Sequence, residues 1–270
     1  MSVSPLLQYF ADELRIARES AGMTQEQLAT CAYVSKSTIA MVETCQRPPK
    51  KDLTTALDST FDTEGRFERM REALLKAEVA PEWFLPWRDR EREATALRSY
   101  HSGLVEGLLQ APDYIRAVLR ADASLTDDDV DQRVAARLER QSILAVENPP
   151  MLIAVVDEAT LRRPVGGPQV MHAQCRYLLE ASQRPRTLIQ VIPLSAGMHP
   201  GLDGPFVIAS FDGAGEAVYL DGQRGFIVDR PEVISAVKAS WETLRAEALS
   251  QRQSADLIAE VAESWISNDS

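Results

Sequence analysis

The sequence predicts an α+β protein in which a small all-helical region precedes a larger region of mixed helices and strands. Two patterns predict this fold class. Over the first 77 residues, apolar side chains recur every three or four positions, as they do on the buried face of a helix. Beyond residue 150, short apolar runs rich in β-branched residues alternate with helical patterns, which is typical of strands and helices packed in layers. We therefore expect a helical domain at residues 1–77, a connector at 78–96 and an α+β domain at 97–270.

The first helix is predicted from Pro5 to Ala21, and Gly22 ends it. Its apolar side chains recur at helical intervals: Leu7, Phe10, Leu14 and Ala17. A second, shorter helix is predicted to begin at Thr24. Thr24 with Gln27 three positions later is the pattern in which a hydroxyl and an amide satisfy the first free backbone donors of a helix. Leu28 and Cys31 mark the apolar face of this helix.

A third helix is predicted to begin at Ser35, with Ile39 and Val42 on its buried side. Its other side carries four small polar, basic or flexible side chains: Lys36, Ser37, Thr38 and Met41. Two short helices joined by a tight turn match a helix-turn-helix, whose second helix can enter a DNA major groove. DNA binding is therefore the leading hypothesis.

Basic residues and prolines follow this third helix. Pro48 and Pro49 forbid its continuation, because proline lacks the backbone donor. Arg47, Lys50 and Lys51 beside them could reach DNA phosphates or could belong to a solvated loop, and both interpretations stay open. Two more helices, predicted at Asp52–Thr60 and Glu64–Ala77, complete the bundle.

The connector at residues 78–96 is unusually aromatic. Trp83, Phe84 and Trp87 are too apolar for a free linker, while Pro81 and Pro86 prevent one long helix. Docking onto a neighbouring part of the protein is the simplest expectation. A base-stacking platform is disfavoured, because acidic side chains downstream would repel a phosphate backbone.

Strands and helices alternate in the second region. Apolar runs predict strands at Met151–Val156, Thr187–Ile192, Pro205–Phe211 and Ala217–Leu220. The turn-like interval 212–216 joins the last two and predicts a hairpin. Helices are predicted from Pro112 onward and at Asp127–Val146, Met171–Ser182, Pro231–Ser250 and Ser254–Trp265. Most of the apolar surface of the last two is expected in the core, although they are also candidates for a pairing surface.

The net charge argues against a strongly basic DNA binder. The chain carries 29 basic and 40 acidic residues, a formal charge of −11. Residues 1–51 hold six basic and five acidic side chains, a local charge near +1, so the excess acid lies downstream. A monomer with so few cations would release few counterions, and useful affinity requires two copies on one site. We therefore expect a homodimer.

Composition also indicates where the protein works. No run of about eighteen apolar residues exists to span a membrane, and the N-terminus lacks the charged-then-apolar order of a signal peptide. Cys31, Cys45 and Cys175 have no metal-ligand spacing and are expected to be small buried or incidental thiols. These features predict a cytoplasmic protein with no membrane partner.

At TQEQLA and VSKSTIAMVE the chain resembles the Cro/phage-repressor, or Xre-type, DNA-binding domains. The resemblance implies that Gln25 contacts the DNA backbone and that Lys36, Ser37, Thr38 and Met41 face base edges. It also implies an internal salt bridge between Arg18 and Glu43. That family usually has glycine where Cys45 stands, in the left-handed conformation that closes the recognition helix. We therefore expect Thr44–Gln46 to end this helix differently.

The second region resembles a C-terminal domain of unknown biochemical function in actinobacterial regulators, including the WhiJ-like proteins. The motifs that carry the likeness are Gly107–Gln110, Pro112–Tyr114, Arg137–Gln141, Asp157–Arg163 and Gly204–Phe206. Glu106 stands where a proline usually precedes the first motif. The resemblance implies a repressor or modulator role, often with a very small partner protein encoded nearby.

Enzyme motifs are missing from the sequence. The acidic run Asp127–Asp131 lacks the pattern of a calcium loop and suits a helix start. His101 and His172 are scattered, with no hydrolase or metalloprotease motif beside them. The loop with His199 and Gly201 is the one candidate to face a ligand or partner. No catalytic residue, metal or cofactor is expected.

These patterns favour a dimeric, sequence-specific transcriptional regulator with a double-stranded DNA operator and a C-terminal domain for dimerisation and signal input. The main alternative is an antitoxin-like interaction module that sequesters a small partner protein, with DNA binding secondary. A third interpretation makes the C-terminal domain a small-molecule enzyme.

Overall fold

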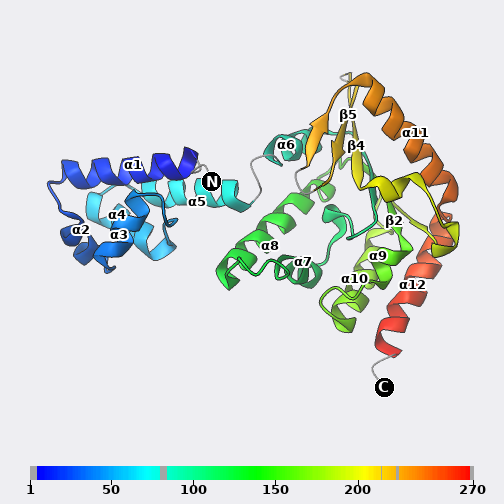
Figure 1. The fold of residues 1–270 in the computed structure, drawn as a ribbon, viewed down its shortest axis with the longest axis horizontal. Helices are drawn as coiled ribbons and strands as arrows, with labels where there is room; N and C mark the ends of the chain where they lie inside the picture. Colours follow the sequence, from blue (N-terminus) through cyan, green and yellow to red (C-terminus); the bar gives the residue numbers. More distant parts are fainter. Residues whose placement is uncertain (1–4, 80–83, 214, 223–224, 268–270) are drawn as a thin grey trace. The chain divides into compact units, whose positions relative to one another are not determined.

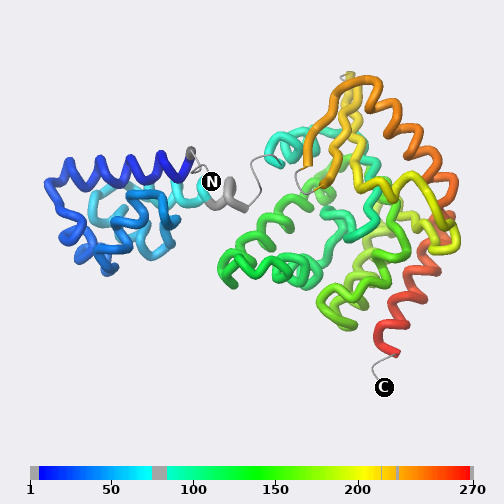
Figure 2. Tube along the Cα trace, viewed as in Figure 1, coloured from blue at the N-terminus to red at the C-terminus, as the bar shows by residue number. Residues whose placement is uncertain are grey.

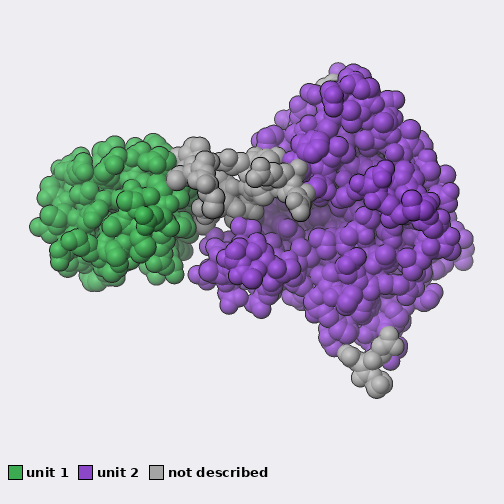
Figure 3. All heavy atoms as spheres, viewed as in Figure 1, with its two compact units in different colours: residues 1–81 green, residues 82–270 purple. Residues whose placement is uncertain are grey.

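The computed structural model describes residues 5–79, 84–213, 215–222 and 225–267. The chain divides into two units, Met1–Pro81 and Glu82–Ser270, coloured separately in Figure 3. Each unit has its own hydrophobic core. The N-terminal unit is entirely helical in its described part, and the C-terminal unit mixes helices with a sheet, so the predicted α+β class is confirmed.

Five helices form the first unit. They are α1 (Pro5–Ser20), α2 (Gln25–Cys31), α3 (Lys36–Glu43), α4 (Lys51–Phe61) and α5 (Arg66–Val79). All five predicted helices are present, with ends shifted by one or two residues. Their apolar faces meet in one core, where Phe10, Leu14, Leu28, Ile39 and Phe67 are fully buried. Cys31 is exposed instead of lying on the apolar face of α2, where Leu28 and Ala29 are buried.

Six strands form one mixed sheet in the second unit. They are β1 (Ala96–His101), β2 (Met151–Asp157), β3 (Thr187–Ile192), β4 (Phe206–Phe211), β5 (Gly215–Leu220) and β6 (Phe226–Val228), in the order β3-β2-β1-β4-β5-β6. Strands β1, β2 and β3 are parallel, and β4 pairs antiparallel with both β1 and β5. The four predicted strands and the hairpin are confirmed. The central strand β1 and the edge strand β6 were missed.

Helices cover both faces of this sheet (Figure 1). They are α6 (Leu85–Glu93), α7 (Pro112–Leu119), α8 (Asp127–Gln141), α9 (Glu158–Arg162), α10 (Pro168–Ala181), α11 (Pro231–Glu247) and α12 (Gln251–Ser267). The core on one face includes side chains from α6, α7, α10 and α12, and α10 packs along α12 (Figure 2). Helix α11 covers the other face with Trp241 and Leu244. No described helix is long and apolar enough to cross a membrane.

The residues expected in a connector divide between the units. Trp83 lies outside the described residues. Phe84 and Trp87 pack into the core of the second unit, where Trp87 is fully buried and stacks on Tyr219 with ring centroids 4.9 Å apart. Phe84 meets the same tyrosine edge-on at 5.7 Å. Phe84 and Trp87 are therefore packed inside the second unit.

The last two helices use their apolar faces within the chain. Ile258, Val261 and Ala262 of α12 are buried in the core beside α10, and Trp241 and Leu244 of α11 are buried against the sheet. These buried side chains cannot also pair two subunits, so core packing accounts for the largest apolar side chains of both helices, while much of the rest of α11 is exposed.

Candidate nucleic-acid interface

Reciprocal caps begin helix α2. The Oγ1 atom of Thr24 accepts a hydrogen bond from the backbone N–H of Gln27 at 3.2 Å, and Gln27 Oε1 accepts from the N–H of Thr24 at 2.8 Å. This capping box is the one that the sequence predicts. It fixes where α2 starts and brings Gln25 to the first turn of that helix.

Hydroxyl groups gather at the start of α3. Ser35 Oγ accepts the N–H of Thr38 at 3.2 Å and lies 2.8 Å from the hydroxyls of Ser37 and Thr38. Ser35, Lys36 and Ser37 are exposed, and Thr38 and Met41 are half-exposed. The opposite side of the helix is buried through Ile39 and Val42. One face of α3 therefore anchors it in the core while the other presents polar groups to solvent.

Helix α3 closes with a left-handed residue, contrary to the expected departure. Cys45 has a φ of 58°, its N–H donates to Val42 O at 3.1 Å, and the N–H of Gln46 donates to Met41 O at 2.8 Å. This is the Schellman arrangement that glycine usually completes. The Cys45 Sγ atom is half-buried 3.7 Å from the Leu7 carbonyl oxygen, and this packing offsets part of the cost of the conformation.

A buried ion pair joins the first three helices. Arg18 Nε donates to Glu43 Oε1 at 2.6 Å and Arg18 Nη2 to Glu43 Oε2 at 3.2 Å, with side chains 12% and 5% exposed. The hydrogen bond to Glu43 raises the pKa of Arg18 above its ordinary value. Gln25 Nε2 also donates to Glu43 Oε2, at 2.7 Å. Gln25 is thus held against Glu43, and only its remaining amide hydrogen is left for a phosphate.

The expected cations have different surroundings. Lys36 is 62% exposed and its Nζ lies 3.5 Å from Glu26 Oε2. Lys50 and Lys51 are exposed at the start of α4, where Lys50 caps the helix without a side-chain hydrogen bond, while Arg47 is half-buried. Lys36 is therefore accessible, but the nearby carboxylate of Glu26 partly neutralises its positive charge.

Tyr33 is a surface feature that the sequence reasoning missed. It lies in the turn between α2 and α3, has a φ of 55° and is 94% exposed. A large aromatic residue between two short predicted helices, where a small turn residue is usual, was the available signal.

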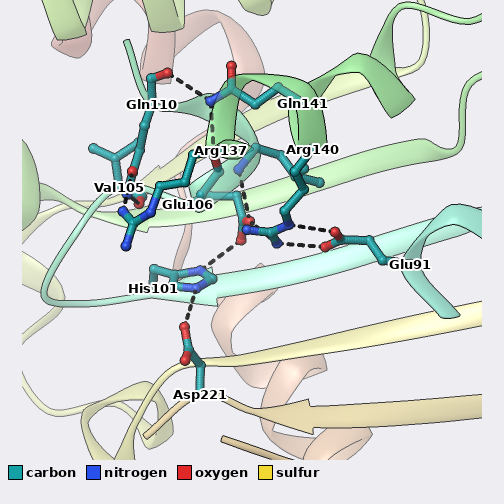
Figure 4. A network of polar contacts seen from close by, with 11 residues as sticks. Glu91, His101, Val105, Glu106, Gln110, Arg137, Arg140, Gln141 and Asp221 are labelled. Carbon is teal, nitrogen blue, oxygen red and sulfur yellow. Dashed lines mark hydrogen bonds and ion pairs between the residues drawn. The ribbon is translucent and has the colours of Figure 1, made fainter. Parts of the chain in front are cut away.

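The second unit holds a buried polar network, drawn in Figure 4. Arg140 of α8 donates from Nε and Nη2 to the two carboxylate oxygens of Glu91 at 2.6 and 2.7 Å, and its Nη2 lies 3.8 Å from Glu106 Oε1. His101 at the end of β1 places Nδ1 3.0 Å from Glu106 Oε2 and Nε2 3.5 Å from Asp221 Oδ2. Glu106, the departure from the family motif, is thus a central member of the network.

Charge balance explains why these groups tolerate burial. Burial by itself lowers the pKa of Arg140, but Glu91, Glu106 and Asp221 together raise it by more, so the net pKa is above its ordinary value. Burial also lowers the pKa of His101, but Glu106 and Asp221 together raise it by a larger amount. The net pKa therefore lies above its ordinary value. Arg137 has Gln110 as its hydrogen-bond acceptor, and burial lowers the pKa of its guanidinium to about 10.

The motif Gly107–Gln110 is held against this network. A Cβ atom at Gly107 would lie 2.6 Å from Arg140 Nη1, so a side chain there would force the guanidinium to shift. Gln141 Nε2 donates to the carbonyls of Gly107 and Gln110 at 3.0 and 2.8 Å. The motif residues therefore build the contact between α8 and the segment after β1.

Packing accounts for both residues of the candidate ligand loop. His199 is buried, and its Nε2 lies 3.3 Å from Asp157 Oδ2 at the end of β2. Gly201 lies against Tyr100, because a Cβ there would meet the ring at 2.3 Å. The ring of Tyr100 also meets that of His199 edge-on at 5.9 Å. These contacts hold the loop on the sheet.

The acidic run at the start of α8 has structural partners. Asp129 completes a capping box with Thr126, accepting from its N–H at 2.9 Å. Asp127 and Asp131 pair with Arg120 and Arg116. The run therefore caps α8 and ties it to α7.

Two family models match the chain. One, described as a helix-turn-helix domain, matches residues 10–73, which include α2 and α3. The other, described as a domain of unknown function (DUF5753), matches residues 86–260, more than half of the chain and the whole sheet. No curated protein and no solved structure gives a match.

We expect Glu43→Ala to destabilise the first unit by about 3–5 kcal/mol, because it leaves the guanidinium of Arg18 buried without its partner. Urea unfolding of the full chain, followed by hydrogen exchange of peptides within residues 5–79, measures this. Glu26→Ala is the matched control: it removes an ion pair whose two side chains are exposed and should change little. Equal effects of both variants would refute the role of burial.

Stability of the second unit should depend on His101. Its folded pKa is raised, so its contribution is complete below the unfolded value of about 6.5 and is lost as the pH rises through the folded pKa. Unfolding of the wild-type chain between about pH 6 and pH 9 should show this decline, and His101→Gln should flatten it. His172→Gln is the control and should keep the slope. An unchanged slope in His101→Gln would contradict the assignment.

Proposed function

The chain belongs to the family defined by the DUF5753 domain and carries a helix-turn-helix domain before it, and from this premise we propose a sequence-specific transcriptional regulator that binds an operator as a homodimer. The helix-turn-helix domain indicates a DNA-binding regulator. We further propose that the C-terminal unit dimerises the protein and receives a signal or a small partner protein, as the resemblance to WhiJ-like regulators suggests. An operator-binding protein of this kind works in the cytoplasm and needs no catalytic step.

The single observation that carries this proposal is the two-sided character of α3. Ile39 and Val42 hold the helix in the core, while its N-terminal end presents Lys36, Ser37 and Thr38 to solvent. A recognition helix reads base edges with residues of its N-terminal turns. A lysine suits the acceptors of guanine, and serine or threonine hydroxyls suit either donors or acceptors.

Charge supports a dimer in the proposal. The local charge near +1 in residues 1–51 limits the affinity that one head, meaning the N-terminal unit of one chain, gains from counterion release. Glu26 beside Lys36 reduces the gain further. Two heads held together bind more tightly without a new contact, because the second contact becomes intramolecular.

The base-reading assignment predicts opposite effects from two neighbouring charges. Lys36→Ala should weaken binding to the operator by about 1–3 kcal/mol and relax specificity at one base position. Glu26→Gln should tighten binding, because it frees Lys36 and removes a negative charge near the phosphates. Operators selected from random DNA by the full chain, followed by titrations of each variant, measure both effects. The absence of any selected sequence would refute the proposed function, and wild-type affinity in both variants would refute the groove assignment.

Affinity should also depend on the second unit. Residues 1–77 alone should bind a half-site at micromolar concentrations or weaker, and the full chain should gain about 10² to 10⁴ in affinity. The selected operators should hold two related half-sites separated by about one helical turn or a multiple of it. Sedimentation of the full chain and footprinting of both proteins test this. A full-length monomer that binds one half-site no more tightly than the head would contradict the dimer.

A further inference from the structure

Tyr33 adopts a backbone conformation that its side chain disfavours. Its φ of 55° lies in the left-handed region, which glycine occupies freely and bulky residues rarely do. Its N–H donates to Thr30 O at 3.3 Å, and the N–H of Val34 donates to Ala29 O at 3.0 Å, so the turn closes α2 in the Schellman manner. The turn requires the conformation, but nothing in it requires a tyrosine.

Other left-handed residues have local compensation. Cys45 packs its thiol against α1, and Asp62 is one of the residue types that tolerate this region. The carbonyl of Glu64 accepts a hydrogen bond from Arg69, and that of Arg186 accepts one from Leu152. The ring of Tyr33 is 94% exposed and makes no ring contact or side-chain hydrogen bond with the described residues. The fold of the first unit therefore gives the ring of Tyr33 no packing role.

Tyr33 is exposed to solvent two residues before the N-cap of α3. Val34, the next residue, is half-buried against the core of the first unit, whereas Tyr33 itself is 94% exposed. Ser35, one residue further, is the N-cap of α3, and Lys36 follows it in solvent. In a helix-turn-helix complex this end of the recognition helix enters the groove, and the phosphates border that groove.

We propose that Tyr33 contacts the sugar–phosphate backbone at the edge of the groove read by α3, with its phenol O–H donating to a phosphate oxygen. Tyrosine hydroxyls commonly donate to DNA phosphates. Because the tyrosine side chain is neutral, this contact adds affinity without a further cation. Residues 1–51 carry few cations. The inference rests on the proposed function and adds one residue to its interface. A second copy of the chain is the competing occupant of the exposed ring.

The test compares Tyr33→Phe and Tyr33→Gly in the full chain on the selected operator. Loss of the hydroxyl in Tyr33→Phe should weaken binding about three- to tenfold, the usual worth of one hydrogen bond. Tyr33→Gly should weaken binding at least as much, yet should raise the urea midpoint of the first unit, because glycine relieves the left-handed strain. The salt dependence of binding should keep its wild-type slope in both variants, because no charge is removed. A loss of affinity together with a gain in stability separates a contact from a folding defect.

Three results would overturn the inference. Wild-type affinity in both variants would show that Tyr33 does not touch DNA. A loss of affinity that accompanies conversion to monomers in sedimentation would assign the ring to a second copy of the chain. If neither the wild-type chain nor the two variants select an operator, the proposed function fails together with the inference. If the wild-type chain selects an operator and both variants bind it equally well, only the inference fails.

Discussion

A carboxylate that leaves water must be paired, and each unit is organised by one such pair. Glu43, 5% exposed, is held by Arg18, and Glu91, 1% exposed, is held by both fork nitrogens of Arg140. Removing one partner of a buried pair leaves a charge that neither water nor protein neutralises, so such pairs constrain the helices that supply them. In the first unit this constraint joins α1 to α3, and in the second it joins α6 to α8.

These pairs have consequences for nearby polar groups. Gln25 at the start of α2 turns its amide to Glu43, so α2 is oriented by the same carboxylate that fixes α3. Arg140 passes so close to the segment after β1 that a side chain at position 107 would displace its guanidinium. Glu106 then supplies the carboxylate between Arg140 and His101. In each unit, one guanidinium therefore lies at the centre of the polar contacts around its buried glutamate.

The buried contacts of α3 also fix the position of its exposed groups. Because α3 is pinned by its buried side and by Glu43, its hydroxyl-rich start and Lys36 have a defined position on the surface. Residues 1–51 carry few cations, and for this reason we propose that affinity for DNA comes partly from neutral contacts and from a second copy of the chain. The second unit has a hydrophobic core on each face of its sheet.

The sequence by itself determined the features that depend on residues close together in the chain. Helix starts at Thr24 and Ser35, apolar faces such as Ile39 with Val42, and the runs that become β2 and β3 are local patterns, because caps and periodicity involve neighbours a few positions apart. Tertiary structure decided the rest. Strand β1 has no continuous apolar run and becomes the middle of the sheet only through pairing with β2 and β4, far away in sequence.

Partners distant in the chain likewise decided the buried charges and the backbone strain. The carboxylate of Glu106 resembles any surface acid until His101 and the distant Arg140 surround it. The thiol of Cys45, a residue with a left-handed φ, packs near Leu7 of α1, and Tyr33, with a similar φ, is exposed beside the half-buried Val34. A local pattern cannot carry this information, because burial and pairing are properties of the surroundings that folding assembles.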